Sequence, residues 1–442
     1  MRVVLPTLFC GALVTALSGD EALQKWGGPR GGHEISHGGN SIGNGDAGGI
    51  NIDTGGGDIG DIGVGVGGGG SGSGCDLAAC DAKCPAGSTC SSGACICASF
   101  QAQATFGTGT FPHGVAVGDF NGDGYLDIVA ANAGDSTASI LLGTGSGTFQ
   151  GQTAFPVGYQ PFYIALGDFN GDGNLDIVTA NTGDDTISIL LGTGSGSFQS
   201  QATYPVGAVP FGITVRDLNG DGHLDIVATD QGDNTVSVLL GTGSGTFQAQ
   251  TTFGVGSTPD DVAVGDFNGD GYLDIVTANT GDNTVSVLLG TGSGSFLAQT
   301  TFPVGSQPDG VAVGDFNGDS HLDIVASNFV DNTVSVLLGT GSGTFQPQTT
   351  FTVGAAPHDV AVGDFNRDGH LDIVTSNIVD NTVSVLLGTG SGSFLAQTTF
   401  PVGSQPDGVA VGDFNGDGYL DIVAGNLDGH SVSVLLGKPC GP

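Results

Sequence analysis

A nine-residue phrase rich in Asp, Asn and Gly recurs along most of this chain at a constant interval. Its first copy reads Asp-Phe-Asn-Gly-Asp-Gly-Tyr-Leu-Asp, an Ile-Val pair follows all seven copies, and each copy begins 49 residues after the one before. The first aspartates of the seven copies are Asp119, Asp168, Asp217, Asp266, Asp315, Asp364 and Asp413. Such a strict period is typical of repeat proteins, in which one supersecondary unit packs against its copies.

Each unit contains four short segments that are β-branched or alternate between apolar and polar residues, bounded by Gly, Asn, Asp or Pro. In the fourth unit the expected strands are Asp261–Asp266, Leu273–Ala278, Thr284–Leu289 and Phe296–Phe302. Four strands in about 40–50 residues is the size of a propeller blade. We therefore expect an all-β fold, a seven-bladed β-propeller of four-stranded blades, over residues 98–442. A solenoid is the structural alternative, but its repeats are usually shorter or helical.

The seventh unit ends at Gly437, after its third strand, so it lacks a fourth strand of its own. Residues 100–106 match the fourth strand of a complete unit, residues 247–253. We expect this N-terminal segment to pair beside Val432–Leu436, because a closed ring leaves no open seam between its first and last blades.

Six cysteines fall within residues 75–97, a density typical of a small disulfide-stapled module in a secreted protein. A zinc site is the alternative, but paired Cys-x-x-Cys motifs and nearby histidines are missing. Cys97 and Cys440 both map to the turn between the third and fourth strands of a unit. A Cys97–Cys440 disulfide is therefore predicted to replace the missing peptide connection, with Cys95 as the other partner for Cys440.

The N-terminal residues divide into two further segments. Residues 1–18 combine Arg2, an apolar stretch and small residues before Gly19, which is the pattern of a secretory signal peptide and is too short for a convincing membrane span. Residues 19–74 are dominated by Gly and are expected to form a disordered tether. The protein is thus expected to be secreted or held at the cell surface, with no transmembrane span.

The chain is strongly acidic, with 44 Asp and Glu against 7 Lys and Arg and a formal net charge of -37. This charge repels nucleic acid and anionic lipid, so neither is expected as a partner. Divalent cations are the natural counterions.

The recurring phrase itself has the chemistry of a cation site. In the first copy, side-chain oxygens stand at positions 1, 3, 5 and 9, and position 7 offers a backbone carbonyl. An all-oxygen set of this size favours calcium (Ca2+) over magnesium. The loop is not an EF-hand, because Ala130 stands where a bidentate Glu is required. The alternative is a turn without metal, since Asp, Asn and Gly favour turns in any case.

Applied to every copy, the pattern predicts up to seven calcium sites. Their ligands would be Asp119, Asn121, Asp123, Tyr125 and Asp127; Asp168, Asn170, Asp172, Asn174 and Asp176; Asp217, Asn219, Asp221, His223 and Asp225; Asp266, Asn268, Asp270, Tyr272 and Asp274; Asp315, Asn317, Asp319, His321 and Asp323; Asp364, Asn366, Asp368, His370 and Asp372; Asp413, Asn415, Asp417, Tyr419 and Asp421.

Residues 98–442 resemble the FG-GAP/VCBS-like calcium-loop repeats of integrin α-subunit propellers, of bacterial extracellular proteins and of a fungal lectin. The resemblance rests on Asp-x-Asn-x-Asp-Gly-x-x-Asp followed by Ile-Val. It implies calcium on one rim and ligands docking elsewhere, on the upper face or between blades. Two loops depart from the pattern: Ser320 and Arg367 replace glycines in the fifth and sixth copies, and either change would weaken or distort its site.

No catalytic group stands out in the repeats. They contain no Glu, and their Gly-Thr-Gly-Ser-Gly segments do not match a nucleophile elbow, so no catalytic residues are predicted. Variation among the units instead points to ligand recognition, or else to neutral drift. The residue after each proline varies, as His113, Phe162, Phe211, Asp260, Asp309, His358 and Asp407, and a second variable position carries Phe329 and Ile378.

The function expected from these patterns is a secreted or surface-attached binding or adhesion module for a glycan or an extracellular protein. Phe162, Tyr163, Phe211 and Phe329 are the candidate ligand-binding residues. A polysaccharide lyase or hydrolase on a calcium propeller and a purely structural surface protein are the alternatives.

Overall fold

The computed structural model describes residues 89–91 and 94–439, with side chains from residue 97 onward. The predicted signal segment, the Gly-rich segment, most of the Cys-rich segment and Cys440 lie outside the described residues. Within the described part of the chain all regular structure is β-strand, and no helix is long and apolar enough to cross a membrane.

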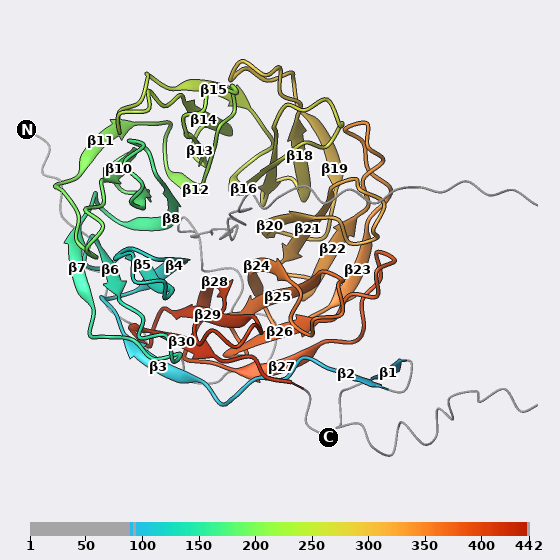
Figure 1. The fold of residues 1–442 in the computed structure, drawn as a ribbon. Coiled ribbons are helices and arrows are strands. Elements are labelled where there is room, and N and C mark those ends of the chain that lie inside the picture. Colours follow the sequence, from blue (N-terminus) through green and yellow to red (C-terminus); the bar gives the residue numbers. More distant parts are fainter. Residues whose placement is uncertain (1–88, 92–93, 440–442) are drawn as a thin grey trace, which may run out of the picture. The chain divides into compact units, whose positions relative to one another are not determined.

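Seven four-stranded antiparallel sheets are arranged around a central axis as the blades of a propeller (Figure 1). The innermost strand of each blade contacts the innermost strands of both neighbours, and the last blade contacts the first in the same way. The ring is therefore closed, and the seven-bladed fold predicted from the sequence is confirmed.

The strands occupy corresponding positions in every blade. The innermost strands are β4 (Pro112–Gly118), β8 (Pro161–Gly167), β12 (Pro210–Arg216), β16 (Pro259–Gly265), β20 (Pro308–Gly314), β24 (Pro357–Gly363) and β28 (Pro406–Gly412). The second strands are β5 (Asp127–Asn132), β9 (Asp176–Asn181), β13 (Asp225–Asp230), β17 (Asp274–Asn279), β21 (Asp323–Asn328), β25 (Asp372–Asn377) and β29 (Asp421–Asn426).

The outer half of each blade follows the same order. The third strands are β6 (Thr137–Leu141), β10 (Thr186–Leu190), β14 (Thr235–Leu239), β18 (Thr284–Leu288), β22 (Thr333–Leu337), β26 (Thr382–Leu386) and β30 (Ser431–Leu435). The outermost strands are β7 (Thr153–Pro156), β11 (Ala202–Pro205), β15 (Thr251–Gly254), β19 (Thr300–Pro303), β23 (Thr349–Thr352), β27 (Thr398–Pro401) and β3 (Ala104–Gly107). A separate hairpin consists of β1 (Thr89–Ser91) and β2 (Ala94–Ile96).

The second strand of each blade forms the core because both of its faces are covered by neighbouring blades. In β17, Ile275 packs with Val227 and Val236 of the third blade, whereas Val276 packs with Val311 of the fifth. Burial on both faces explains why these strands are nearly continuous apolar runs instead of alternating ones.

The outermost strand is shorter than the sequence predicts. In the fourth blade it begins at Thr300 and not at Phe296, which makes only an isolated bridge to Gly290. The turn between those two residues contains Gly292 and Gly294 at positive φ, so the chain bends away from the ladder before pairing resumes.

The N-terminal strand completes the seventh blade. β3 pairs antiparallel with β30, with Ala104 opposite Val434 and Phe106 opposite Val432, which is the strand exchange predicted from the sequence. The Lys438 amide also donates to the Ser99 carbonyl at 2.9 Å, so the two chain segments run together beyond the strand. Cys97 is disulfide-bonded. Its predicted pairing with Cys440 remains a prediction.

Every innermost strand runs from its proline to the aspartate that opens the recurring loop. We call the proline end of the propeller the upper end and the loop end the lower end. The turns between second and third strands, such as residues 133–136, also lie at the upper end, because their amides bond to the segment before each proline. The two ends therefore carry different parts of each repeat.

Candidate functional site

The recurring loops at the lower end are closed by hydrogen bonds from their own backbone. In the first loop, Asp119 Oδ1 accepts from the Gly122 amide at 2.7 Å and Asp119 Oδ2 accepts from the Gly124 amide at 2.8 Å. Asn121 Oδ1 accepts from the Asp123 amide at 2.8 Å. Both glycines have positive φ, which explains their place in the phrase.

The ninth loop residue ties the loop to the rest of its blade. Asp127 is fully buried, and its two oxygens accept from the amides of Phe120 at 2.8 Å and Gly143 at 2.7 Å. Burial, together with the nearby charges of Asp119 and Asp123, raises the pKa of Asp127 to about 6. The equivalent aspartates of all the other loops also have raised pKa values, reaching about 7 in Asp372 and Asp421.

The chemistry of the loop oxygens favours calcium binding, whereas the spacing of the loop carboxylates does not. The donors are all oxygens and the loop carboxylates repel one another, both of which suit a hard cation. In the described residues, however, no group of three or more carboxylate, His or Cys side chains is gathered around one point. Calcium would thus require the loop carboxylates to draw closer than they stand here.

The two loops that depart from the phrase keep its backbone shape. Ser320 and Arg367 adopt positive φ values of 68° and 63°, as the glycines do elsewhere. The Ser320 amide still donates to Asp315 Oδ2 at 2.8 Å. The Arg367 guanidinium lies 5.1 Å from the centre of the Tyr419 ring, a cation–π contact between the sixth and seventh loops.

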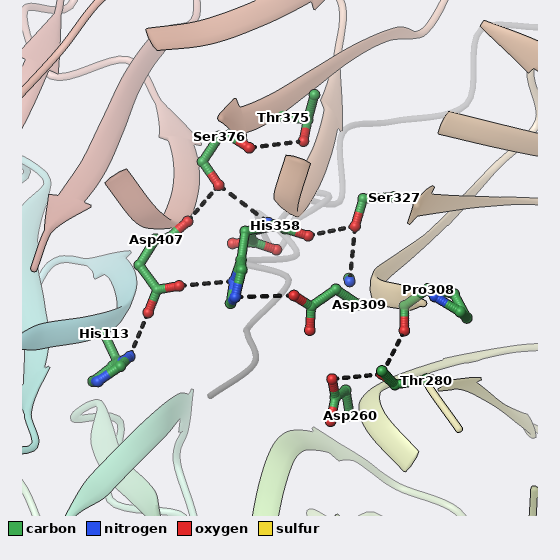
Figure 2. A network of polar contacts seen from close by, with 12 residues as sticks. His113, Asp260, Thr280, Pro308, Asp309, Ser327, His358, Thr375, Ser376 and Asp407 are labelled. Atoms are coloured by element: carbon green, nitrogen blue, oxygen red, sulfur yellow. Dashed lines mark hydrogen bonds and ion pairs between the residues drawn. The ribbon is translucent and has the colours of Figure 1, made fainter. Parts of the chain in front are cut away.

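At the upper end, residues that follow the prolines meet across blade boundaries (Figure 2). His358 Nε2 lies 2.9 Å from Asp309 Oδ2 on the preceding blade, and His358 Nδ1 lies 2.7 Å from Asp407 Oδ1 on the following blade. Asp407 Oδ2 also contacts His113 Nδ1 of the first blade. We call His113, Asp309, His358 and Asp407 the axial clasp.

Asp260 extends this polar chain into the fourth blade. The hydroxyl of Thr280 donates to its Oδ2 at 2.6 Å, the amide of Gln231 donates to its Oδ1, and the carboxyl shares a hydrogen bond with Asp309. Burial and the charge of Asp309 raise the pKa of Asp260 well above its usual value.

The predicted ligand-binding aromatics lie in the interior of the same region. Phe162 stacks on Phe211 with ring centroids 5.1 Å apart, and Tyr163 and Phe211 have no exposed surface. Phe162 is 9% exposed, and Phe329 is half-buried with its ring 5.9 Å from that of His358. The first three residues thus offer no open ring face to a sugar, because the neighbouring innermost strands cover them.

Asp261 and Asp359 were not singled out by sequence reasoning, yet both connect neighbouring blades. Asp261 Oδ2 accepts from the Val311 amide at 2.9 Å, and Asp359 Oδ2 accepts from the Val409 amide at 2.6 Å. In each case the amide lies one repeat plus one residue further along the chain. The signal in the sequence was an Asp at the same register in two non-adjacent units, where other units have Gly or Tyr.

The upper surface also exposes apolar side chains. Val330 and Val379, next to Phe329 and Ile378, are 44% and 66% exposed, and Tyr159 is 55% exposed. Within residues 97–439 the only Lys and Arg residues are Arg216, Arg367 and Lys438, which lie at the lower end of β12, in a lower loop and after Gly437. The described upper face therefore carries carboxylates without Lys or Arg.

Comparison with solved structures identifies the same fold in proteins of low sequence identity. A streptogramin B lyase structure is 16% identical over 77% of this chain and 98% of that chain, with a TM-score of 0.55. BBS1N in complex with ARL6DN, soaked with mercury, is 14% identical over 77% and 96%, with a TM-score of 0.57. A catalytically inactive virginiamycin B lyase from Staphylococcus aureus with quinupristin is 16% identical over 76% and 99%, with a TM-score of 0.53. These likenesses concern the fold alone.

The sequence comparisons are more specific. No curated protein matches the chain at a significant level. A family model described as FG-GAP-like repeat matches residues 98–130, 119–179, 168–228, 217–277, 266–326, 321–375 and 376–424. Together these matches span residues 98–424, and each of them includes at least one complete recurring loop, so the chain belongs to the FG-GAP-like repeat family.

Proposed function

We propose that this protein is a calcium-dependent binding module, secreted or attached to a cell surface, whose lower loops hold Ca2+ and whose upper face docks an extracellular protein. The predicted signal peptide and the Gly-rich tether support this location. The observation that carries the proposal is the apolar patch formed by Phe329, Val330, Ile378 and Val379. The other five upper turns have no such apolar pair. At the position of Val330 and Val379, the first four turns carry Gly and the seventh carries Asp428.

The charge around this patch indicates what kind of partner it fits. Asp331 and Asp380 follow the two valines directly and are exposed. Because no Lys or Arg of the described residues lies on this face, a partner presenting basic groups around an apolar tip would be both attracted and desolvated there. An acidic partner would be repelled.

A glycan ligand is the second candidate, supported by a different part of the same face. Tyr159 and Phe111 are exposed aromatic residues on the first two blades, and exposed rings of this kind stack on sugars. Catalysis is less well supported, because the axial carboxylates and histidines bond to one another and are nearly closed to solvent.

The test is an array of extracellular proteins and glycans probed with and without a calcium chelator. We expect retention on a basic protein ligand, loss of retention in Val330→Asp/Val379→Asp, and no loss in Leu297→Asp. Leu297 is the matched control, because it is 56% exposed in the segment leading to the outermost strand of the fourth blade, away from the upper turns.

Three outcomes would redirect the proposal. Retention on glycans that is lost in Tyr159→Ala but kept in the valine variant would favour the glycan reading. Retention that survives both changes would remove the upper face from the proposal, and retention unchanged by the chelator would remove its calcium dependence.

A further inference from the structure

The axial clasp contains a buried histidine whose two ring nitrogens both face carboxylates. The side chains of His358, Asp309 and Asp407 are 6%, 3% and 1% exposed. Neutral imidazole carries a proton on only one nitrogen, so both contacts can be hydrogen bonds to carboxylates only if His358 is a doubly protonated cation. The contacts between the innermost strands at this part of the axis thus depend on the protonation of one side chain, His358.

The clasp joins three successive blade boundaries, and one of them is the seam of the ring. His358 connects β24 to β20 and β28, and the contact between Asp407 and His113 connects β28 to β4. At the seam the outer closure is made by β3 pairing with β30. The clasp is therefore an inner closure at the same junction.

We propose that the axial clasp is a proton-dependent closure, which holds the innermost strands of the fifth, sixth, seventh and first blades together while His358 is charged and loosens the upper end of the axis when His358 loses its proton. This proposal does not depend on the function proposed above. It concerns the propeller ring alone and is tested without a ligand.

The two carboxylates that face the His358 ring favour its charged form. Asp309 and Asp407 face it from the neighbouring innermost strands, and Asp359 follows it on β24. From the adjacent second strand, Ser327 offers a neutral hydroxyl that donates to the His358 carbonyl. Although burial disfavours the cation, the charges of Asp309 and Asp407 raise the pKa of His358 well above its usual value.

The direction of the pH dependence follows from this pKa. A histidine whose pKa is raised in the folded state stabilises the fold below its unfolded pKa of about 6.5, and this stabilisation is lost as the pH rises through the folded value. Asp260, Asp261 and Asp359 also have raised pKa values, because burial favours their neutral forms, so they act in the same direction. The axis is thus expected to be tightest at mildly acidic pH.

The first measurement uses the unaltered protein. The His358 ring resonances are followed by NMR from about pH 5 to about pH 9, and they are assigned by their disappearance in His358→Gln. We expect the cationic signature of both ring nitrogens to persist well above pH 6.5. A midpoint at or below about 6.5 would overturn the proposal.

The second measurement compares melting temperatures over the same pH range at constant calcium. We expect the melting temperature of the unaltered protein to fall from about pH 6 to about pH 9, and the fall to be clearly smaller in His358→Gln and in Asp407→Asn. Asp331→Asn is the matched control, since it removes the same charge from an exposed upper turn and should keep the full fall. Equal falls in all four proteins would contradict the clasp.

A third readout covers variants that fail to fold. Hydrogen exchange of the Val409 amide, which Asp359 holds beside the clasp, is measured in the unaltered protein and corrected for intrinsic exchange. We expect its protection to decrease toward pH 9 by about tenfold or more relative to the Val276 amide in the core of the fourth blade. Unchanged relative protection would show that the clasp does not open.

Discussion

The two ends of each innermost strand differ in how they manage buried carboxylates. At the lower end each of the seven loops has a buried aspartate whose pKa is raised by burial and by the charges of the other aspartates of its loop. At the upper end the carboxylates of Asp309 and Asp407 instead contact His358, which lies on the blade between them. Among the described residues the only Lys or Arg within a lower loop is Arg367, whose guanidinium lies over the Tyr419 ring, whereas at the upper end the carboxylates contact a histidine.

This difference separates two ways of building a repeat. A loop that depends on an external cation can be copied without change, because the cation is the same for every blade. A closure made from opposite side-chain charges needs different residues on successive blades, since like charges at equivalent positions would repel one another. The blades must therefore differ in sequence at the axis, whereas the loops at the lower end need not differ.

Removing calcium tests the lower end with the largest expected effect. At a free calcium concentration about tenfold above the dissociation constant, each site adds roughly 1.4 kcal/mol, so seven sites add about 10 kcal/mol. We expect a chelator to lower the melting temperature strongly, and Asp270→Ala to reduce both the calcium stoichiometry and the stability. An unchanged melting temperature after chelation would mean that the loops are closed by their hydrogen bonds alone.

The pH dependence should change sign when calcium is removed. In the metal-free protein the raised pKa values of Asp127, Asp372 and Asp421 mean that the folded state takes up protons, so stability falls as the pH rises from about 4 through 6–7. With calcium in excess, protons compete with the metal, and stability should rise over the same range. Thermal melts in four conditions, acidic and neutral, with and without chelator, measure this, and parallel curves would contradict it.

A smaller effect is expected from Asp230, a residue at which one blade differs from the other six. Asp230 ends β13, at the position where the other six blades have Asn, and burial raises its pKa to about 6. Asp230→Asn should stabilise the protein at neutral pH by about 1–3 kcal/mol, because it removes the cost of a buried charge. The gain should disappear below about pH 4, where Asp230 is protonated in either state. Urea unfolding at the two pH values is the measurement.

The smallest expected effect concerns a missing contact between blades. In the upper turns of the third to sixth blades an asparagine at positive φ accepts the amide at the start of the next blade, as Asn332 does from Ala356 at 2.8 Å. The first blade has Ser136 at that position, also at positive φ. Ser136→Asn should add about 0.5–1.5 kcal/mol, and the reverse change Asn332→Ser should remove a similar amount. Opposite shifts in the urea midpoint would support this, and equal shifts would contradict it.

Most of the fold could be predicted because the information is local and repeated. The period, the turn residues and the apolar runs are each contained within one unit, so the blade count, the strand order and the pairing of residues 100–106 with the last blade follow from counting. The start of the outermost strand was misplaced, because Phe296 has the composition of a strand but the preceding glycines turn the chain away from the ladder.

The site was only partly predictable. The loop pattern identifies an oxygen-rich turn, but the spacing of its carboxylates is set by the folded loop. In the described residues the carboxylates are not gathered around one point. The aromatic residues Phe162 and Phe211 were expected to bind a ligand, although their position on the innermost strands places them inside the propeller. The second variable position, Phe329 and Ile378, is half-buried, and the exposed residues are the valines that follow it, Val330 and Val379.

By itself, the sequence determined what one unit is and how many times it occurs, because strand pattern and turn chemistry act over a few residues. Only the tertiary structure decided which units' side chains meet at the axis. His358 is in contact with Asp309 and Asp407, each 49 residues away in the chain, and His113 contacts Asp407 from the opposite end of the repeat region. The physical reason is ring closure, which brings equivalent positions of neighbouring blades, and of the first and last blades, within hydrogen-bonding distance.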